Sequence, residues 1–199
     1  MRPVIVALDT DLKRALSIAE QLREEVAGFK IGWDLVLEAG LDPIRRISKL
    51  GQVIVDLKLA DIPYVVNRVV NKVVEAGACC AIAHGLIAPS LEPDQRIYLL
   101  VRMTTPTLYD DLWRQLVPTA GKFRGAVAPG NAPSTVAEVR KVLGCSARII
   151  SPGIGAQGGK PGDAIRAGAD FEIVGRYLIE EPSRISQWDK LKPTCWNSI

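Results

Sequence analysis

Three charged side chains, Asp56, Lys58 and Asp61, lie within six residues of one another at the end of an apolar run. The run, residues 52–58, is typical of a strand that is buried on both faces. Side chains two residues apart on a strand point the same way, so Asp56 and Lys58 are expected to face one site. Asp61 lies beyond the strand and need not share that direction. A structural ion pair at a strand end would explain Asp56 and Lys58 equally well.

Carboxylates beside lysines suit three kinds of chemistry: a Mg²⁺ site, a Schiff-base lysine, or a fixed array of charges. Mg²⁺ prefers oxygen ligands, and nearby ammonium groups would oppose its binding. A Schiff-base lysine must lose its proton, whereas carboxylates about 4 Å away favour the charged form by up to a few kcal/mol. We therefore expect Lys58 to stay protonated at neutral pH. A fixed ammonium group is a good proton donor and a good partner for negative charge developing on carbon.

The elements that must position these residues alternate along the chain. Helical patterns, such as residues 12–26, 63–77 and 133–144, separate continuous apolar runs that are typical of strands covered on both faces. This alternation predicts either a doubly wound sheet or a (β/α)8 barrel, which would be short at about 200 residues. The segment 87–96 is short and interrupted by proline, so we expect a rudimentary fourth helix. The expected strands are residues 3–9, 28–32, 52–58, 79–84, 97–103, 124–129, 147–152 and 171–175.

Polar residues at the carboxyl ends of these strands favour the barrel, because a barrel gathers such residues around one mouth. With Lys30, Asp9 and Asp61 added to Asp56 and Lys58, a functional site explains the charges better than an isolated ion pair. His84, the only histidine, could be a base or a packed ring. No second base or nucleophile stands beside it, so we favour the structural role. The strand-end residues are Asp9, Lys30, Asp56, Lys58 and His84.

The segment 151–162 contains the letters G-x-G-x-x-G at Gly153, Gly155 and Gly158. A dinucleotide site also needs an acid at the end of the next strand, but that strand ends in Gly175 and Arg176, so we reject this interpretation. Loops after strands seven and eight of a barrel commonly bind phosphate. Bare glycine N–H groups and the guanidinium of Arg176 suit an oxyanion. A flexible turn and a surface arginine are the alternative, but their positions favour phosphate binding.

Composition restricts the class of protein further. The chain has 199 residues, 48% of them hydrophobic and 24% charged, with a net charge of +3. We therefore expect one domain over residues 1–199. No basic run with interleaved aromatic residues predicts binding to nucleic acid. The apolar segment near Met1 is too short for a signal peptide or a membrane span, so we expect a cytoplasmic protein without membrane attachment.

The four cysteines, Cys79, Cys80, Cys145 and Cys195, show no spacing typical of a metal site. Cys79 and Cys80 are adjacent in an expected strand, where neighbouring side chains face opposite ways. Buried free thiols are the favoured expectation. A disulfide bond of Cys145 or Cys195 stays open for a protein of a hyperthermophile.

The segment "DLKLADIP" resembles the D-x-K-x-x-D-I-P signature of the orotidine 5′-monophosphate decarboxylases. The similarity continues in "ALD" at strand one, "FKIG" at strand two, "SPGIGAQGG" at strand seven and "IVGR" at strand eight. We therefore expect a single-domain (β/α)8 TIM barrel of the compact, archaeal type. The resemblance implies the conversion of orotidine 5′-monophosphate (OMP) to UMP and CO₂ without cofactor or metal, the last step of pyrimidine nucleotide synthesis.

The resemblance also implies roles for single residues. Asp56 would crowd the substrate carboxylate, and Lys58 would stabilise and protonate the carbanion. Asp61 and Ile62 would act across the interface of a homodimer. The charged tetrad would be Lys30, Asp56, Lys58 and Asp61. The remaining substrate contacts would be Asp9 and Lys30 to the ribose, Thr104 to the pyrimidine, Gln157, Gly175 and Arg176 to the phosphate, with Pro152, Gly153, Ile154 and Gly155 beside them.

Two positions depart from the family pattern. Val65 stands where the family usually has a threonine that reaches the partner's ribose, and Thr104 replaces a serine. One alternative is a Mg²⁺-dependent sugar-phosphate decarboxylase or aldolase of the same suprafamily, which shares D-x-K-x-x-D but has an acid near the position of Lys30. Another is a catalytically silent phosphate-binding barrel. Lys30 and the "DIP" ending argue against the first, and the intact tetrad argues against the second.

Overall fold

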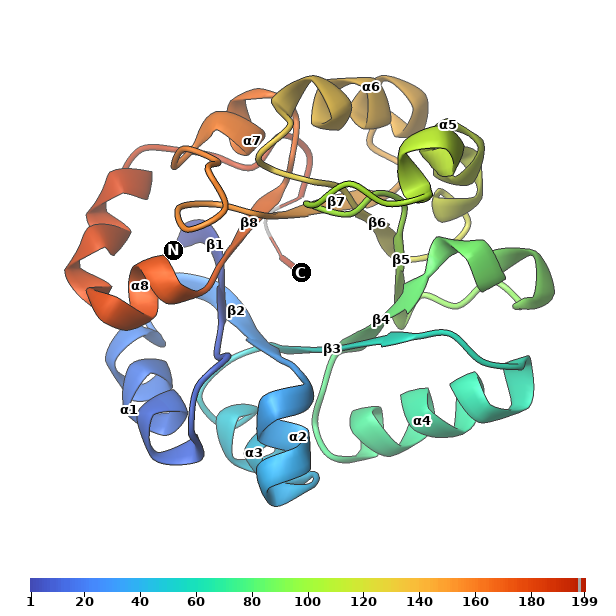
Figure 1. The fold of residues 1–199 in the computed structure, drawn as a ribbon. Coiled ribbons are helices and arrows are strands. Elements are labelled where there is room, and N and C mark those ends of the chain that lie inside the picture. The colour runs from blue at the N-terminus through green and yellow to red at the C-terminus, as the bar shows by residue number, and fades with distance from the viewer. Residues whose placement is uncertain (197) are drawn as a thin grey trace.

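Eight parallel strands pair in chain order, and the last pairs with the first, so that the sheet closes into a barrel (Figure 1). The structure is a computed structural model that describes residues 1–196 and 198–199. It confirms the expected (β/α)8 barrel in one compact domain, and each expected strand range overlaps one strand. The strands are β1 (Arg2–Ala7), β2 (Val26–Ile31), β3 (Val53–Leu59), β4 (Cys80–His84), β5 (Ile97–Leu100), β6 (Gly125–Val127), β7 (Arg148–Pro152) and β8 (Phe171–Val174).

The helices surround the barrel and cover its outer face (Figure 1). The three helical patterns expected from the sequence are confirmed, with small differences at their carboxyl ends. The fourth connection is only a 3-10 helix with Pro89 inside it, as expected for a rudimentary helix. The helical segments are α1 (Leu12–Leu22), α2 (Trp33–Ala39), α3 (Asp42–Ile47), α4 (Pro63–Glu75), η1 (Gly85–Ser90), α5 (Tyr109–Ala120), α6 (Pro133–Leu143), α7 (Asp163–Arg166), α8 (Arg176–Glu180) and η2 (Pro182–Trp188).

Both faces of each strand are buried, which explains the continuous apolar runs. Alternate residues of β1 belong to different parts of the core. Ile5 packs inside the barrel with residues such as Ile54 and Phe171. Val4 and Val6 pack between the barrel and the helices. The barrel interior is therefore a filled core.

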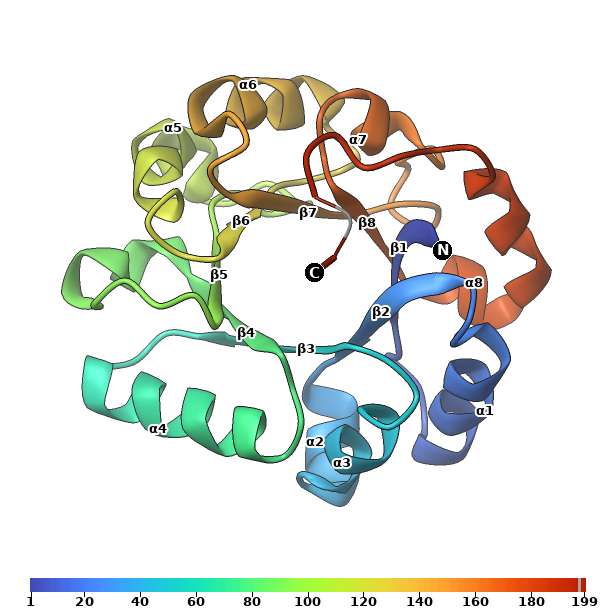
Figure 2. The ribbon, with the colours of Figure 1, turned by 180° about the vertical axis from the view of Figure 1, so that it is seen from behind.

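Residues 194–196 and 198–199, the carboxyl-terminal segment, lie at the amino-terminal end of the barrel (Figure 2). Ile199 is 2% exposed and packs in the inner core beside Gly28, where an added Cβ would lie 2.5 Å from its Cδ1. Arg124, just before β6, donates a 2.5 Å hydrogen bond to the main-chain oxygen of Ile199. Arg148, the first residue of β7, donates to the main-chain oxygen of Ser198. The segment therefore closes the end of the barrel that lies opposite the strand carboxyl ends.

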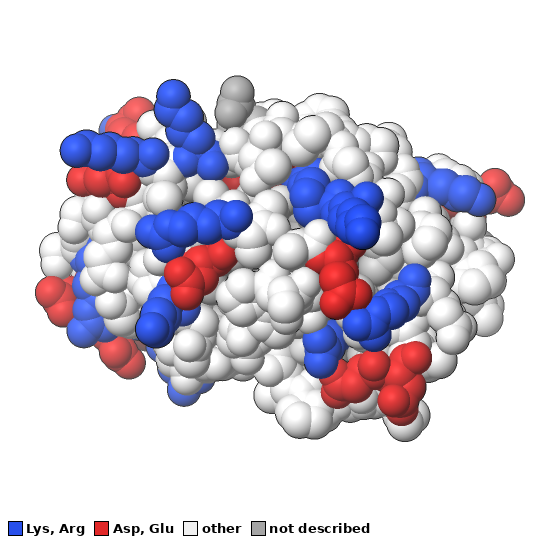
Figure 3. Space-filling model, turned by 90° about the horizontal axis from the view of Figure 1, so that it is seen from above, with Lys and Arg blue, Asp and Glu red and all other residues white. Residues whose placement is uncertain are grey.

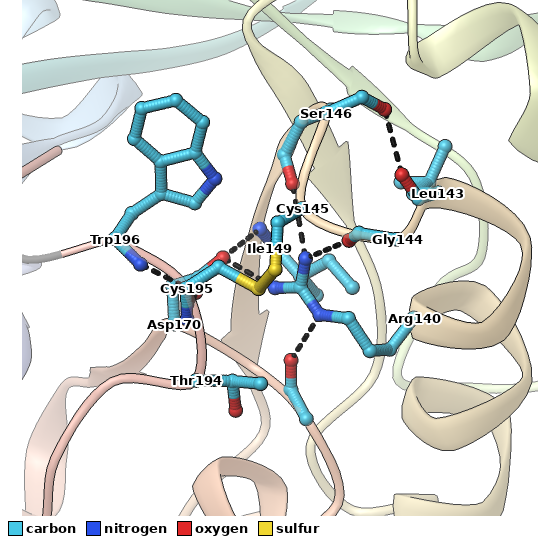
Figure 4. The surroundings of a disulfide bond; sticks show 12 residues. Arg140, Leu143, Gly144, Cys145, Ser146, Ile149, Asp170, Thr194, Cys195 and Trp196 are labelled. Atoms are coloured by element: carbon cyan, nitrogen blue, oxygen red, sulfur yellow. Dashed lines mark hydrogen bonds and ion pairs between the residues drawn. A yellow bond between two sulfur atoms is a disulfide. The ribbon is translucent and has the colours of Figure 1, made fainter.

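A disulfide bond between Cys145 and Cys195 fastens this segment to the turn between α6 and β7 (Figure 4). The buried Asp170 accepts hydrogen bonds from the main-chain N–H groups of Cys195 and Trp196 in the same region. The expectation of free thiols is therefore wrong for Cys145 and Cys195. Their Cα atoms are 5.5 Å apart, within disulfide range, but 50 residues separate them in the chain. Because of this separation in sequence, the pairing of Cys145 with Cys195 could not be predicted from the spacing of the cysteines.

Cys79 and Cys80 are free thiols, as expected. Their side chains do not face opposite ways, and this expectation is wrong. Strand β4 begins only at Cys80, so the strand alternation does not extend to Cys79. The two sulfur atoms consequently lie 2.8 Å apart.

The surface carries charges of both signs. Lys and Arg side chains lie beside Asp and Glu side chains on the face drawn in Figure 3, without a continuous basic area on that face. Across the described residues, no helix combines the length and the apolar character that a membrane span requires.

Candidate active site

A cavity of about 430 Å³ opens at the carboxyl ends of the strands. It brings together residues that are far apart in the chain, as expected for the mouth of a barrel. Three expected site residues, Asp61, Ile62 and Gly155, are not among those that line it. The expected site residues that do line it are Asp9, Lys30, Asp56, Lys58, Thr104, Pro152, Gly153, Ile154, Gln157, Gly175 and Arg176.

Four charged residues form a row of alternating sign on one side of the cavity. Lys30 Nζ lies 3.2 Å from Asp9 Oδ1 and 3.4 Å from Asp56 Oδ2. Lys58 Nζ lies 3.0 Å from the same Asp56 oxygen. Each ion therefore has a neighbour of opposite charge. The row extends from β1 through β2 to β3, which places it across three neighbouring strands.

The charges of this row hold one another in the ionised state. Burial alone would lower the pKa of Lys30, but Asp56 and Asp9 outweigh it and raise the pKa. Burial would raise the pKa of Asp56, but the ammonium groups of Lys30 and Lys58 outweigh it and lower the pKa. A buried lysine and a buried carboxylate thus stay charged at neutral pH because each faces the other. The cavity wall is an array of fixed charges.

The backbone of Lys58 is unusual. Its φ angle is +43°, in the left-handed region that favours glycine. The pairing of β3 with β4 is irregular between Val55 and Leu59, so Lys58 sits where the strand departs from regular geometry. Its side chain is 40% exposed, compared with 8% for Asp56. The irregular backbone therefore brings the ammonium group to the open part of the cavity above the buried carboxylate.

Asp61 and Ile62 lie outside the cavity of their own chain. Asp61 is exposed, and its Oδ1 accepts a 2.7 Å hydrogen bond from the main-chain N–H of Ile62. Ile62 directly precedes α4 and is 62% exposed, and its neighbour Tyr64 is 66% exposed. Because Asp61 follows the strand, it was not required to point the same way as Lys58. In the structure Asp61 lies on the outer surface, away from its own cavity.

The glycine-rich segment after β7 forms a compact loop that is closed by its own backbone. The N–H of Gly155 donates to the oxygen of Gly159, and the N–H of Gly159 donates to the oxygen of Gly153. Gly153, Gly155 and Gly158 have positive φ angles. A Cβ at Gly155 would lie 2.7 Å from the Tyr177 side chain, so only glycine fits there. This loop faces Gly175 and Arg176 across the cavity, in an arrangement that suits an oxyanion.

Thr104 lies on the third side of the cavity. Its methyl group fits against Gly153, where an added Cβ would lie 2.9 Å away, so the extra methyl relative to serine has room. Asn131 Nδ2 donates to the main-chain oxygens of Thr104 and Gln157, at 2.9 Å and 3.3 Å. Asn131 thereby ties the segment with Thr104 to the glycine-rich loop. Asn131 could not be identified from the sequence, since nothing in its local pattern marks it.

Several cavity residues were not expected from the sequence. Arg102 lines the cavity and pairs with Asp110, with Nη2 2.7 Å from Oδ1, and it also donates to Thr135 Oγ1. The expected strand 97–103 included Arg102, but β5 ends at Leu100. With the correct boundary, Arg102 would have counted among the polar residues that follow strand ends and are expected at the mouth of the barrel. The other missed residues are Thr105 and a set of apolar residues, at Ala7, Ile82, Leu100, Met103, Val127, Ala156 and Ile173.

His84 is a packed, hydrogen-bonded ring. Its Nδ1 lies 2.6 Å from the hydroxyl oxygen of Tyr109, and the two rings stack with centroids 5.7 Å apart. Burial and the nearby Lys58 lower the pKa of His84. It does not line the cavity. In the part of the chain that the structure describes, no cluster of three or more His, Cys, Asp or Glu side chains could hold a metal ion.

Comparisons with known proteins agree with this geometry. Among curated proteins, the orotidine 5′-phosphate decarboxylase of Pyrococcus abyssi is 40% identical over 193 residues, covering 90% of this chain and 92% of that protein. The orotidine 5′-phosphate decarboxylase of Methanosarcina mazei is 39% identical over 197 residues, covering 90% and 89%.

Solved structures give the same result. The orotidine 5′-monophosphate decarboxylase from Methanocaldococcus jannaschii complexed with inhibitor BMP has a TM-score of 0.85 at 27% identity, covering 96% of this chain and 100% of that chain. The enzyme from Metallosphaera sedula has a TM-score of 0.81 at 29% identity, covering 96% and 98%. A family model matches residues 2–191. The chain therefore belongs to the orotidine 5′-phosphate decarboxylase / HUMPS family.

Proposed function

We propose that this protein decarboxylates OMP to UMP and CO₂ without a cofactor, as the last step of UMP synthesis. The observation that carries the proposal is the row Asp9–Lys30–Asp56–Lys58, which faces a cavity with a glycine-rich oxyanion loop and Arg176 on its other side. The curated relatives named above act as orotidine 5′-phosphate decarboxylases. Their identity of 39–40% supports the same reaction here.

The charge row suits the chemistry of carboxylate loss. The substrate carboxylate would lie beside Asp56, which is buried and held in its charged form, so the two anions would repel each other in the ground state. When the carbon–carbon bond breaks, CO₂ leaves and the electron pair stays on the pyrimidine carbon. Lys58 would stabilise this carbanion and then transfer a proton from its ammonium group to the same carbon. Asp56 holds Lys58 in place through both carboxylate oxygens, at 3.0 and 3.1 Å.

The rest of the cavity would bind the remainder of the nucleotide. Asp9 and Lys30 would contact the ribose hydroxyls, and Thr104 would hydrogen-bond the pyrimidine. The phosphate would lie between the glycine-rich loop and the start of α8. The residues assigned to the phosphate are Gln157, Gly175 and Arg176, with Pro152, Gly153, Ile154 and Gly155 shaping the loop around it.

Asp61 and Ile62 would complete the cavity of a second copy of this chain in a homodimer. Their position supports this, because both are exposed and lie outside their own cavity, close in the chain to the exposed Tyr64. Val65 offers no hydroxyl, so the dimer would lack one polar contact to the partner's ribose. We also propose that the protein is cytoplasmic, because substrate and product are nucleotides of the cell interior.

The description of the matched family also names a second group, HUMPS. The second candidate is therefore the other reaction type considered from the sequence, a Mg²⁺-dependent reaction on a sugar phosphate. The test is the ultraviolet absorbance change of OMP mixed with the purified protein, with and without EDTA. We expect OMP loss that EDTA does not change. Loss of activity with EDTA and its return with Mg²⁺ would favour the second candidate. No turnover of OMP under any condition would contradict the proposal and leave the second candidate or a silent phosphate-binding barrel.

A further inference from the structure

Glu172 is a buried acid that the proposed reaction does not use. It lies in the middle of β8 and is 0% exposed. Its neighbours Phe171 and Ile173 pack inside the barrel, so Glu172 points outward, toward the surrounding helices. Among the described residues, no lysine, arginine or histidine forms an ion pair with it. A buried carboxylate without a counter-ion is unusual, because burial strongly disfavours a charge that has no compensating partners.

The partners of Glu172 are four N–H groups. Oε2 accepts hydrogen bonds from the main-chain N–H of Gly162, at 2.9 Å, and from the Trp188 indole, at 2.5 Å. Oε1 accepts from the main-chain N–H groups of Ala164, at 2.9 Å, and Ile165, at 3.3 Å. Burial raises the pKa of Glu172, and these N–H groups partly offset that rise. The carboxylate therefore replaces its lost water with donors from α7 and η2.

The contact with Gly162 determines where the glycine-rich loop ends. That loop begins at Gly153, beside the cavity, and its first half is closed by its own hydrogen bonds. Its second half leaves the cavity and reaches Gly162, whose φ angle is +83°. There the loop is fastened to Glu172 on the next strand. Without this contact, the end of the loop would keep its connection to α7 and its packing against Leu191.

The same strand carries the other half of the oxyanion site. Gly175 and Arg176 follow Glu172 by three and four residues, just beyond the end of β8. Glu172 thus fastens the glycine-rich loop to the strand that supplies Arg176. The pairing of β7 with β8 and the packing of Gly155 against Tyr177 hold the near part of the loop beside this strand, and Glu172 adds the fastening at its far end.

We propose that Glu172 is a positioning residue for the phosphate group of the substrate. It sets the distance between the glycine-rich loop and Arg176 without touching the ligand. This proposal rests on the proposed function, since it assumes that the ligand is a nucleotide monophosphate. The pyrimidine and ribose contacts come from other strands and do not depend on Glu172.

The test compares a ligand with phosphate to one without it. Dissociation constants of UMP and uridine are measured by NMR titration for the wild type, Glu172→Gln and Arg176→Ala. The glutamine amide presents an NH₂ group to the N–H donors, so at least one hydrogen bond to the loop or to α7 is lost. We expect Glu172→Gln to weaken UMP binding about tenfold and uridine binding less than about twofold. Arg176→Ala removes a direct contact with the phosphate, so it shows how much UMP binding weakens when that contact is lost completely.

Asp170 provides a control for the loss of a buried carboxylate. It is also 0% exposed, lies two residues from Glu172, and accepts main-chain hydrogen bonds from Ile149, Cys195 and Trp196. Unlike Glu172, it also forms an ion pair with Arg140. Its partners lie at the closed end of the barrel, away from the cavity. Asp170→Asn should lower the melting temperature as Glu172→Gln does, yet leave the ratio of UMP to uridine affinity unchanged. A general loss of packing would instead lower that ratio in both variants, and this result would overturn the proposal.

Trp188→Phe keeps the carboxylate and removes one donor, so it should fold even if Glu172→Gln does not. We expect a smaller decrease in the UMP to uridine ratio, in the same direction. An unchanged ratio in every Glu172 and Trp188 variant that folds would overturn the positioning role. The proposed function fails separately, if the wild type does not decarboxylate OMP or binds uridine as tightly as UMP.

Discussion

Lys58 Nζ lies 3.0 and 3.1 Å from the two carboxylate oxygens of Asp56, its neighbour two positions earlier in β3. The ammonium group is thus centred on the carboxylate, while the opposite side of Lys58 remains open to the cavity. The contact is local in sequence and needs no distant element to form. Asp56 is almost fully buried and Lys58 is not, so the carboxylate is held in place while the ammonium group is accessible from the cavity.

Replacement of Lys58 by alanine should lower the rate of decarboxylation by at least about 10⁴-fold, because the proton donor and the counter-charge of the carbanion are lost together. The fold should persist, since the side chain is 40% exposed. Turnover of OMP and the circular dichroism spectrum are the measurements. Lys141→Ala on the exposed face of α6 is the control and should behave as wild type. Near-normal turnover by Lys58→Ala would contradict the mechanism.

Two inactive variants should restore activity when they share a dimer. The Asp61→Asn and Lys58→Ala variants are co-expressed with different tags, and the mixed dimer is purified. If Asp61 acts across the interface, one active site of the mixed dimer carries both substitutions and the other carries neither. The mixed dimer should then show about half of the wild-type activity. If Asp61 served its own chain, the purified mixed dimer would be inactive.

Asp56 should stabilise the fold in a pH-dependent way. Its pKa is lowered below 3.8, so its contribution is fully present above that pH and is lost as the pH falls through the folded-state value. At pH 7, Asp56→Asn leaves two lysines without their shared anion and should lower the free energy of unfolding by about 3 kcal/mol. Urea unfolding should show the gap to wild type narrowing below pH 3.8.

The surface pair of Asp42 and Arg46, both about half exposed, offers a control for this titration. Asp42→Asn should change stability by less than about 1 kcal/mol at every pH, because water screens the pair. A gap between wild type and Asp56→Asn that stays constant down to pH 2 would contradict the assigned charge state of Asp56.

Reduction of the bond between Cys145 and Cys195 should destabilise the protein without affecting the chemistry. The bond spans 50 residues, and closure of such a loop in the unfolded chain is worth about 4 kcal/mol. For a domain of this size, the melting temperature should fall by about 10 °C in Cys145→Ser or with a reductant. Turnover per folded molecule should stay constant, because the bond lies at the closed end of the barrel. Cys79→Ser under the same conditions controls for other thiols.

Strand-end residues such as Asp9, Lys30 and Asp56 could be placed at one mouth from the sequence, because parallel strands in a barrel must end together. The alternation of apolar runs and helical patterns predicted all eight strands. Asn131 and the contact of Glu172 with Gly162 could not be predicted, since each depends on loops whose course no periodic pattern describes. The Cys145–Cys195 bond depends on the return of the chain around Cys195 to the turn before β7, which is equally a matter of tertiary packing.

The left-handed backbone of Lys58 also has an evolutionary consequence. At a φ of +43°, any residue with a Cβ is disfavoured relative to glycine by roughly 1–2 kcal/mol. Lys58→Gly should therefore be more stable than Lys58→Ala in urea unfolding, the reverse of the usual order of these two residues in a strand. Selection for thermal stability alone would replace this lysine with glycine. The lysine is therefore a trade-off, in which the protein gives up stability at the residue proposed to transfer the proton.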